Sequence, residues 1–110
     1  MTHRCANAGT AWFRRICLAA TVCAMSPAAA QSPEQIAAGA RVYSRNCSPC
    51  HGVRMRDPEG AFDLRKFPRD AKERFAASVL NGKGQMPPWN GLLSPEEVEQ
   101  VWSYVVEGEK

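Results

Sequence analysis

The residues most able to do chemistry lie close together, at Cys47, Cys50 and His51. Two residues separate the thiols, and the imidazole follows the second thiol directly. This C-x-x-C-H spacing is the attachment motif of c-type haem, in which each thiol adds across one vinyl group of the porphyrin. The spacing lets both sulfurs reach the vinyl groups from one helical turn, and it places the histidine beneath the iron as the proximal ligand.

Three other interpretations of the motif stay open beside haem attachment. A thioredoxin-like dithiol has the same C-x-x-C spacing, but it is expected in a strand–helix setting, whereas this motif ends a helix and no βαβ pattern surrounds it. A structural zinc site needs four ligands, and the motif supplies only three. A disulfide between the two cysteines would be a poor staple for a small chain, because only two residues separate them.

A second iron ligand is expected on the face of the porphyrin opposite the histidine. After residue 30 the chain has no histidine besides His51, and its methionines are Met55 and Met86. Met55 follows His51 too closely to reach the opposite face, so we expect it to pack in a loop or against the haem edge. Met86 lies in "NGKGQMPPW", where glycines allow close backbone approach and prolines stiffen the segment.

Met86 is therefore the candidate sixth ligand, although methionines more commonly fill space in a core. Histidine–methionine ligation raises the reduction potential of haem iron. It also closes the coordination sphere, which leaves no position for a substrate or for dioxygen. This pattern favours electron transfer over catalysis.

The first thirty residues have the three-part pattern of a signal peptide. Three arginines with no acid precede the apolar run Ile16–Met25, which is too short for a permanent membrane anchor, and three alanines end at Ala30. We expect cleavage after Ala30, so that residues 1–30 are a signal peptide and residues 31–110 are the one folded domain. This pattern predicts a periplasmic protein with no transmembrane anchor after cleavage.

Cleavage would change the composition of the chain in two ways that bear on function. It would leave Cys47 and Cys50 as the only cysteines, and loss of the three arginines would lower the formal net charge from +3 to zero. A neutral chain lacks the sustained basic excess of a nucleic-acid binder. A domain of about 80 residues buries little surface and often needs a staple, which a bound cofactor could supply.

Helical spacing of apolar residues predicts three helices, at Pro33–Asn46, Ala71–Asn81 and Pro95–Glu107. Ser32, Asp70 and Ser94 are the predicted N-caps, because each has a side chain that can accept from the first turn. Gly82 suits the end of the second helix, since glycine readily adopts positive φ. Residues 52–69 are predicted to form a loop, because prolines and a glycine interrupt them.

These features together resemble small monohaem class I cytochromes c over nearly the whole chain after residue 30. The matching residues are Gly39 and Tyr43 before C-S-P-C-H-G, then "VLNGKGQMPPW" and "LSPEEVEQVWSYV". The resemblance implies an all-α class I cytochrome c fold, with three main helices wrapped round a covalently bound haem. It implies that the first and last helices cross at Gly39, and that Tyr43 packs against the Val101–Trp102 side of the last helix.

The resemblance also implies the contacts around the haem. One haem c per chain would be held through Cys47 and Cys50, with His51 and Met86 as the metal ligands. In this family a proline carbonyl commonly accepts the proximal histidine N–H, which fixes the ring. Pro58 is the nearest candidate for that carbonyl, although "VRMRDPEGAFDLRKFP" departs from the family pattern. The candidates for contact with the propionates are Arg56, Arg65 and Trp89.

The function implied is that of a monomeric one-electron carrier that is not an enzyme and docks transiently with redox proteins. The segment "DPEGAFDLRKFPRD" with the later loop resembles periplasmic cytochromes that accompany PQQ-dependent dehydrogenases. This implies such a dehydrogenase as electron donor and an oxidase or another cytochrome as acceptor. The alternatives are a haem enzyme or gas sensor with a displaceable sixth ligand, and a thiol redox module without a cofactor.

Overall fold

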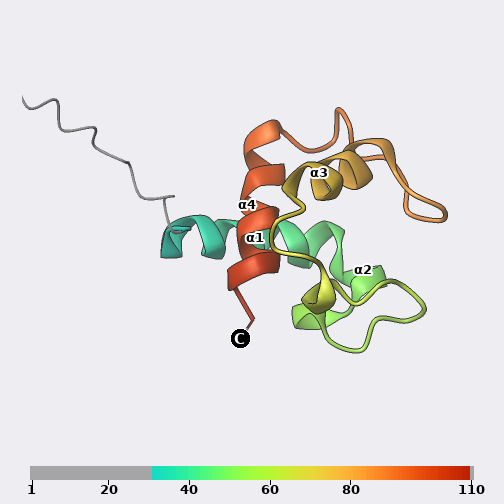
Figure 1. Cartoon of the computed structure of the whole chain (residues 1–110), viewed down its shortest axis with the longest axis horizontal. Coiled ribbons are helices and arrows are strands. Elements are labelled where there is room, and N and C mark those ends of the chain that lie inside the picture. Colours follow the sequence, from blue (N-terminus) through green and yellow to red (C-terminus); the bar gives the residue numbers. More distant parts are fainter. Residues whose placement is uncertain (1–30, 110) are drawn as a thin grey trace, which may run out of the picture.

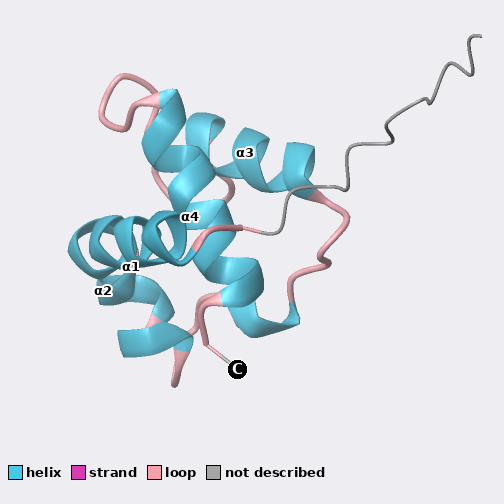
Figure 2. Ribbon diagram, turned by 90° about the vertical axis from the view of Figure 1, so that its left-hand side faces the viewer, coloured by secondary structure: helices cyan, strands magenta, loops and turns pink. Residues whose placement is uncertain are grey.

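The computed structural model describes residues 31–109, so the expected signal peptide and its cleavage site lie outside the described residues. The elements in chain order are α1 (Pro33–Asn46), α2 (Ser48–His51), η1 (Val53–Met55), η2 (Leu64–Lys66), α3 (Lys72–Asn81) and α4 (Pro95–Glu107). Here η marks a 3-10 turn. The described part contains helices and loops without a strand, as Figure 2 shows, which confirms the all-α prediction.

The two long helices begin where their capping residues predict. The Ser32 side chain accepts from the backbone N–H of Gln35 at 3.1 Å and starts α1. At α4, Ser94 and Glu97 form a reciprocal capping box, with bonds of 3.1 and 2.9 Å. Each bond satisfies a backbone N–H that the first helical turn would otherwise leave unpaired, which is why the sequence fixes these starts.

The predicted cap of the middle helix is wrong. Ala71, and not Asp70, is the N-cap of α3, and no side chain caps the helix. The reason is a turn in which the Ala71 N–H donates to the Pro68 carbonyl at 3.2 Å, so that Asp70 lies inside the turn instead of at the helix start. The end of α3 follows the prediction, because Gly82 has a φ of 74°.

The helices α1 and α4 cross at a backbone-to-backbone contact (Figure 1). A Cβ atom built on Gly39 would lie 1.8 Å from the Gln100 carbonyl oxygen and 2.9 Å from the Tyr104 Cβ. No side chain fits at that separation, so glycine is required and the implied role of Gly39 is confirmed. One turn further along both helices, the rings of Tyr43 and Tyr104 pack with centroids 5.2 Å apart.

The hydrophobic core lies between the α1–α4 crossing and α3. Tyr43 shares one buried cluster with Val101 and Trp102, as the resemblance implies, but its ring contact is with Tyr104. The Trp102 ring lies 5.2 Å from that of Phe75 on α3 and 6.1 Å from that of Phe67, which joins the loop before α3 to the core. None of the helices within residues 31–109 has the length and apolar character needed to cross a membrane.

Candidate functional site

Cys47 ends α1 and caps α2, so the two thiols and the imidazole share one turn. The Cys47 N–H donates to the Tyr43 carbonyl at 2.8 Å. The N–H groups of Cys50 and His51 then donate to the Cys47 carbonyl at 3.2 and 2.9 Å. This geometry confirms that the motif closes a helix and lies on a single helical turn.

The two thiols differ in their surroundings. Cys47 is partly buried against the core, whereas Cys50 is exposed, and both are free. Burial, and secondly the neighbouring Cys50 thiol, raises the pKa of Cys47 to about 11. A dithiol that exchanges disulfides needs a cysteine whose pKa is lowered, because the thiolate is the nucleophile. The raised value and the absence of a strand among the described residues both argue against the thioredoxin-like interpretation.

The zinc interpretation fails on the arrangement of ligands. Across residues 31–109, no three histidine, cysteine, aspartate or glutamate side chains converge as a metal-binding group. A structural zinc site needs four such ligands in tetrahedral array. The thiols and imidazole of the motif therefore do not build a protein-only metal centre.

The His51 ring is held by a backbone carbonyl. Its Nδ1 lies 3.0 Å from the Phe62 carbonyl oxygen. Because a carbonyl oxygen only accepts, Nδ1 carries the proton and Nε2 is left with its lone pair. An imidazole oriented in this way is prepared to bind a metal through Nε2, because the hydrogen bond fixes the tautomer and the orientation of the ring.

The expectation that Pro58 supplies this carbonyl is wrong. The Pro58 carbonyl accepts from the Gly60 N–H at 2.9 Å, within a tight turn. The chain therefore continues past Pro58 before it returns to His51 at Phe62. The kind of partner implied by the resemblance is present, but a different residue provides it.

The loop after His51 is tied to α1 and to the core. The Tyr43 hydroxyl donates to the Gly52 carbonyl at 2.7 Å. Met55, expected to pack in a loop, is 1% exposed and belongs to the core. The sequence pattern did not predict the burial of Met55. Arg54 and Met55 adopt left-handed φ values of 56° and 57°, which turn the Met55 side chain inward.

Met86 lies in a short, paired turn after α3. The N–H of Met86 donates to the Lys83 carbonyl at 3.0 Å, and the Lys83 N–H donates in return at 3.1 Å. A Cβ on Gly82 would lie 2.6 Å from the Met86 carbonyl oxygen, so the predicted close backbone approach is present. Met86 and Cys47 are both partly buried against the same core. In Figure 1 the turn after α3 (orange) and α2 (green) lie on the same side of the α1–α4 crossing.

The candidates for propionate contact have different environments. The Arg65 guanidinium is engaged by Asp63, with Nε to Oδ1 and Nη2 to Oδ2 both at 2.9 Å. Arg56 is exposed, and Trp89 is partly buried against the core. These two side-chain bonds use two of the five N–H donors of the Arg65 guanidinium, so all three candidates keep a donor for an anion.

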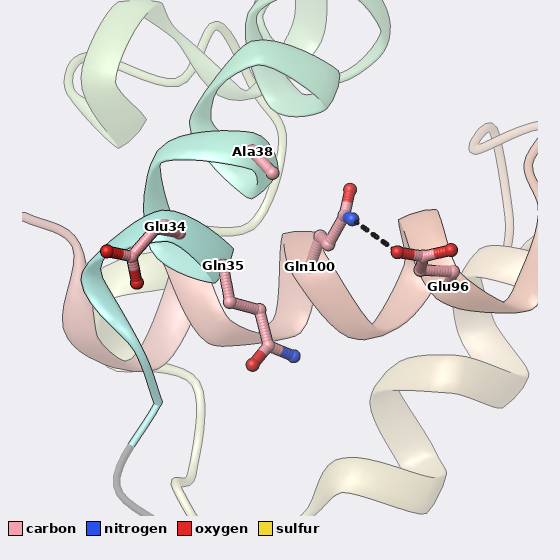
Figure 3. Close-up of a pocket in the computed structure, with 5 residues that line it drawn as sticks. All are labelled: Glu34, Gln35, Ala38, Glu96 and Gln100. Carbon is pink, nitrogen blue, oxygen red and sulfur yellow. Dashed lines mark hydrogen bonds between the residues drawn. The ribbon is translucent and has the colours of Figure 1, made fainter.

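A cavity of about 340 Å³ lies elsewhere, where the first halves of α1 and α4 approach each other (Figure 3). It is lined by Glu34, Gln35, Ala38, Glu96 and Gln100. The Gln100 amide donates to Glu96 at 3.2 Å, along the α4 side of the cavity. The lining contains no thiol, imidazole or thioether, so this cavity is separate from the candidate site.

The buried Tyr43 hydroxyl predicts a loss of stability at alkaline pH. Chiefly through burial, the pKa of Tyr43 rises from 10.0 to about 12. A group whose pKa rises on folding contributes stability that is complete below pH 10.0 and is lost as pH increases toward 12. In urea unfolding over this range, we expect Tyr43→Phe to reduce the fall in unfolding free energy by up to about 1.4 kcal/mol per pH unit. Equal slopes for the variant and the wild type would contradict this.

The chemistry of the donor set fits a covalently bound haem. Two thiols on one turn suit the two vinyl groups, and the imidazole has its Nδ1 occupied and its Nε2 available. A thioether stands in a paired turn at another edge of the same core. A protein-only zinc site and a reactive dithiol each lack a required feature.

Comparison with known proteins agrees with this chemistry. The family described as "Cytochrome C oxidase, cbb3-type, subunit III" matches residues 34–105. Cytochrome c6 of Limnospira maxima is 42% identical over 81 aligned residues, which cover 66% of this chain and 91% of that protein. The chain belongs to this family of c-type cytochromes. It is a small cytochrome whose family carries covalently bound haem c.

Two further relatives of this cytochrome extend the comparison. The c-type cytochrome SorU of Sinorhizobium meliloti has a similar structure, with a TM-score of 0.55, 27% identity, and coverage of 71% of this chain and 97% of that one. The quinohemoprotein alcohol dehydrogenase ADH IIB of Pseudomonas putida is 38% identical over 81 residues, which are 71% of this chain but 12% of that protein. The fold is that of class I cytochromes c, and the cytochrome is an electron-transfer protein, not an enzyme.

Proposed function

We propose that this cytochrome is a periplasmic one-electron carrier with one haem c, bound through Cys47 and Cys50 and ligated by His51 and Met86. The observation that carries the proposal is the orientation of His51. Its Nδ1 donates to the Phe62 carbonyl at 3.0 Å. His51 itself lies on the same helical turn as both thiols. The bound haem supplies a reversible one-electron couple at its iron.

The protein's own residues hold and orient this group. Cys47, at the end of α1, and Cys50, in α2, would hold it through thioethers, and the crossing with α4 keeps α1 in place. The Phe62 carbonyl keeps the His51 ring from rotating, so that Nε2 keeps one direction. The backbone pairing of Lys83 with Met86 presents a soft thioether from a turn that has little freedom to move.

Export and the domain boundary are part of the proposal. Residues 1–30 act as a cleaved signal peptide, and residues 31–110 form the mature cytochrome domain. Gln31 supports a boundary at this point, because its side-chain oxygen accepts from the buried Ser103 hydroxyl at 2.6 Å. The folded contacts therefore reach to the first residue after the proposed cleavage site.

The partners are redox proteins that bind transiently to a monomer. The likeness to a quinohemoprotein alcohol dehydrogenase supports a PQQ-dependent dehydrogenase as electron donor. The family description, which names an oxidase subunit, supports an oxidase as the acceptor. Another cytochrome would serve the same role chemically, because only a one-electron step is needed.

Met86→Ala tests the ligation that separates a carrier from an enzyme or gas sensor. In the oxidised wild-type holoprotein we expect the absorption band of sulfur–iron ligation, and the variant should lose it. The reduction potential should also fall, by on the order of 0.1 V, since axial ligands set haem potentials over a range of about 0.8 V. Spectroscopy and a redox titration measure both effects.

Met55→Leu is the matched control, because Met55 is the other methionine of the proposed mature chain and leucine fills a similar volume. It should retain the band. If the band survives in Met86→Ala, or is absent from the wild type, Met86 is not the ligand. The protein would then have an open or differently filled position, as a haem enzyme or gas sensor requires.

A further inference from the structure

The carboxylate of Glu109 joins the end of α4 to the loop that follows the haem-binding motif. Arg54 donates from Nε to both carboxylate oxygens at 3.2 and 3.1 Å, and its Nη2 lies 2.9 Å from Oε2. The Tyr104 hydroxyl donates to Oε1 at 2.9 Å. The Glu109 side chain is 13% exposed and the Arg54 side chain is 66% exposed, so the carboxylate is largely shielded from water while the guanidinium is open to it.

This contact acts on a strained part of the backbone. Arg54 and Met55 both have left-handed φ values, 56° and 57°, a conformation that is unfavourable for residues other than glycine. Such a conformation persists only where its surroundings hold it. Burial of Met55 holds one residue of the pair, and Glu109 holds the other through the guanidinium of Arg54.

The loop is held at its start by a second contact that belongs to the same cluster. The Tyr43 hydroxyl donates to the Gly52 carbonyl at 2.7 Å, immediately after His51. The rings of Tyr43 and Tyr104 pack with centroids 5.2 Å apart. Contacts therefore run in a closed circuit from α1 through the loop to Glu109, then through Tyr104 on α4 back to α1.

We propose that Glu109 is a positioning residue for the proximal imidazole, acting through Arg54 and the loop that begins beside His51. The inference rests on the proposed function, in which His51 is an iron ligand. The Arg54 guanidinium bonded to Glu109 holds the pKa of that carboxyl below its ordinary value, so the carboxylate is charged at neutral pH. Loss of this charge releases Arg54, relaxes the left-handed pair, and loosens the backbone on which the imidazole is mounted.

A matched control lies at the same end of α4. Glu107 pairs with Arg69 at 2.7 Å, in a contact that reaches the segment before α3 instead of the loop after His51. Glu107→Gln and Glu109→Gln therefore each weaken one arginine–carboxylate pair at one helix end. Only Glu109→Gln is expected to change the histidine.

The test is nuclear magnetic resonance of the holoprotein, read at the His51 ring. We expect solvent exchange of the His51 Nδ1–H to become about tenfold faster in Glu109→Gln, a factor equivalent to about 1.4 kcal/mol. Its iron-shifted ring resonances should move as well. Arg54→Lys should act in the same direction, because an ammonium lacks the planar fork that holds both carboxylate oxygens. Glu107→Gln should change the exchange rate by less than about twofold.

The outcomes separate this inference from the proposed function. Iron-shifted His51 resonances in the wild type, with equal exchange rates in Glu109→Gln and Glu107→Gln, would overturn the positioning role alone. A wild-type protein whose His51 resonances show no effect of iron would overturn the proposed ligation and the positioning role together.

Discussion

Replacing Gly39 with valine should leave the protein unable to form its native crossing of α1 and α4. The first added carbon would lie 1.8 Å from the Gln100 carbonyl oxygen, and that oxygen belongs to the α4 backbone, which cannot rotate away. Overpacking by a side chain commonly costs about 1–3 kcal/mol. Here a whole helix must shift, so we expect more than about 3 kcal/mol, out of the roughly 4–12 kcal/mol of a domain this size.

Ala37→Val is the control for Gly39→Val, because Ala37 is an exposed position of the same helix. It should cost only the small loss of helix propensity of valine, a few tenths of a kcal/mol up to about 0.7. Gly39→Ala keeps the test valid if the valine variant does not fold. Alanine normally stabilises a helix interior by about 0.5–1 kcal/mol relative to glycine. Denaturant unfolding that shows Gly39→Ala to be more stable than the wild type would contradict the close crossing.

Replacing both Cys47 and Cys50 with alanine should abolish covalent attachment of haem. The two thiols are the only ones after residue 30, so no other side chain of the proposed mature chain can form a thioether to a vinyl group. We expect denaturing extraction with acid and organic solvent to remove any haem from the double variant. The wild type should keep its haem through the same extraction.

The single variants and a neighbouring position control this result. Cys47→Ala and Cys50→Ala should each keep haem through one thioether, with a shifted absorption band because one vinyl group stays unsaturated. Ser48→Ala lies between the thiols and should behave as the wild type. Haem that resists extraction in the double variant would show that another residue attaches it, and the proposed site would be wrong.

The helix boundaries were predictable wherever a short-range contact sets them. Ser32 and Ser94 cap their helices through bonds to residues three positions later, and such a pattern is readable in a linear sequence. Asp70 is also of a residue type that caps helices. The Ala71 N–H bonds to the Pro68 carbonyl, so Asp70 lies inside a turn and does not cap α3. Local signals identify a possible cap, and the geometry of the preceding loop decides whether it is used.

The candidate site was also predictable only in part. The thiols and the imidazole are identified by spacing alone, because one helical turn brings them together. The partner of His51 is a backbone carbonyl at Phe62, and every residue has such a carbonyl, so no side-chain type marks it. The contact of Arg54 with Glu109 joins residues 55 positions apart, and nothing in the sequence near either one specifies the other.

The most direct test of the account is the mass of the wild-type chain, exported from a host with cytochrome c maturation and then denatured. We predict a polypeptide of residues 31–110 plus one haem, and peptide fragmentation should place that haem on the segment holding Cys47 and Cys50. A denatured chain with the mass of its polypeptide alone, isolated from a host that loads other c-type cytochromes, would contradict the central claim that this motif holds the haem.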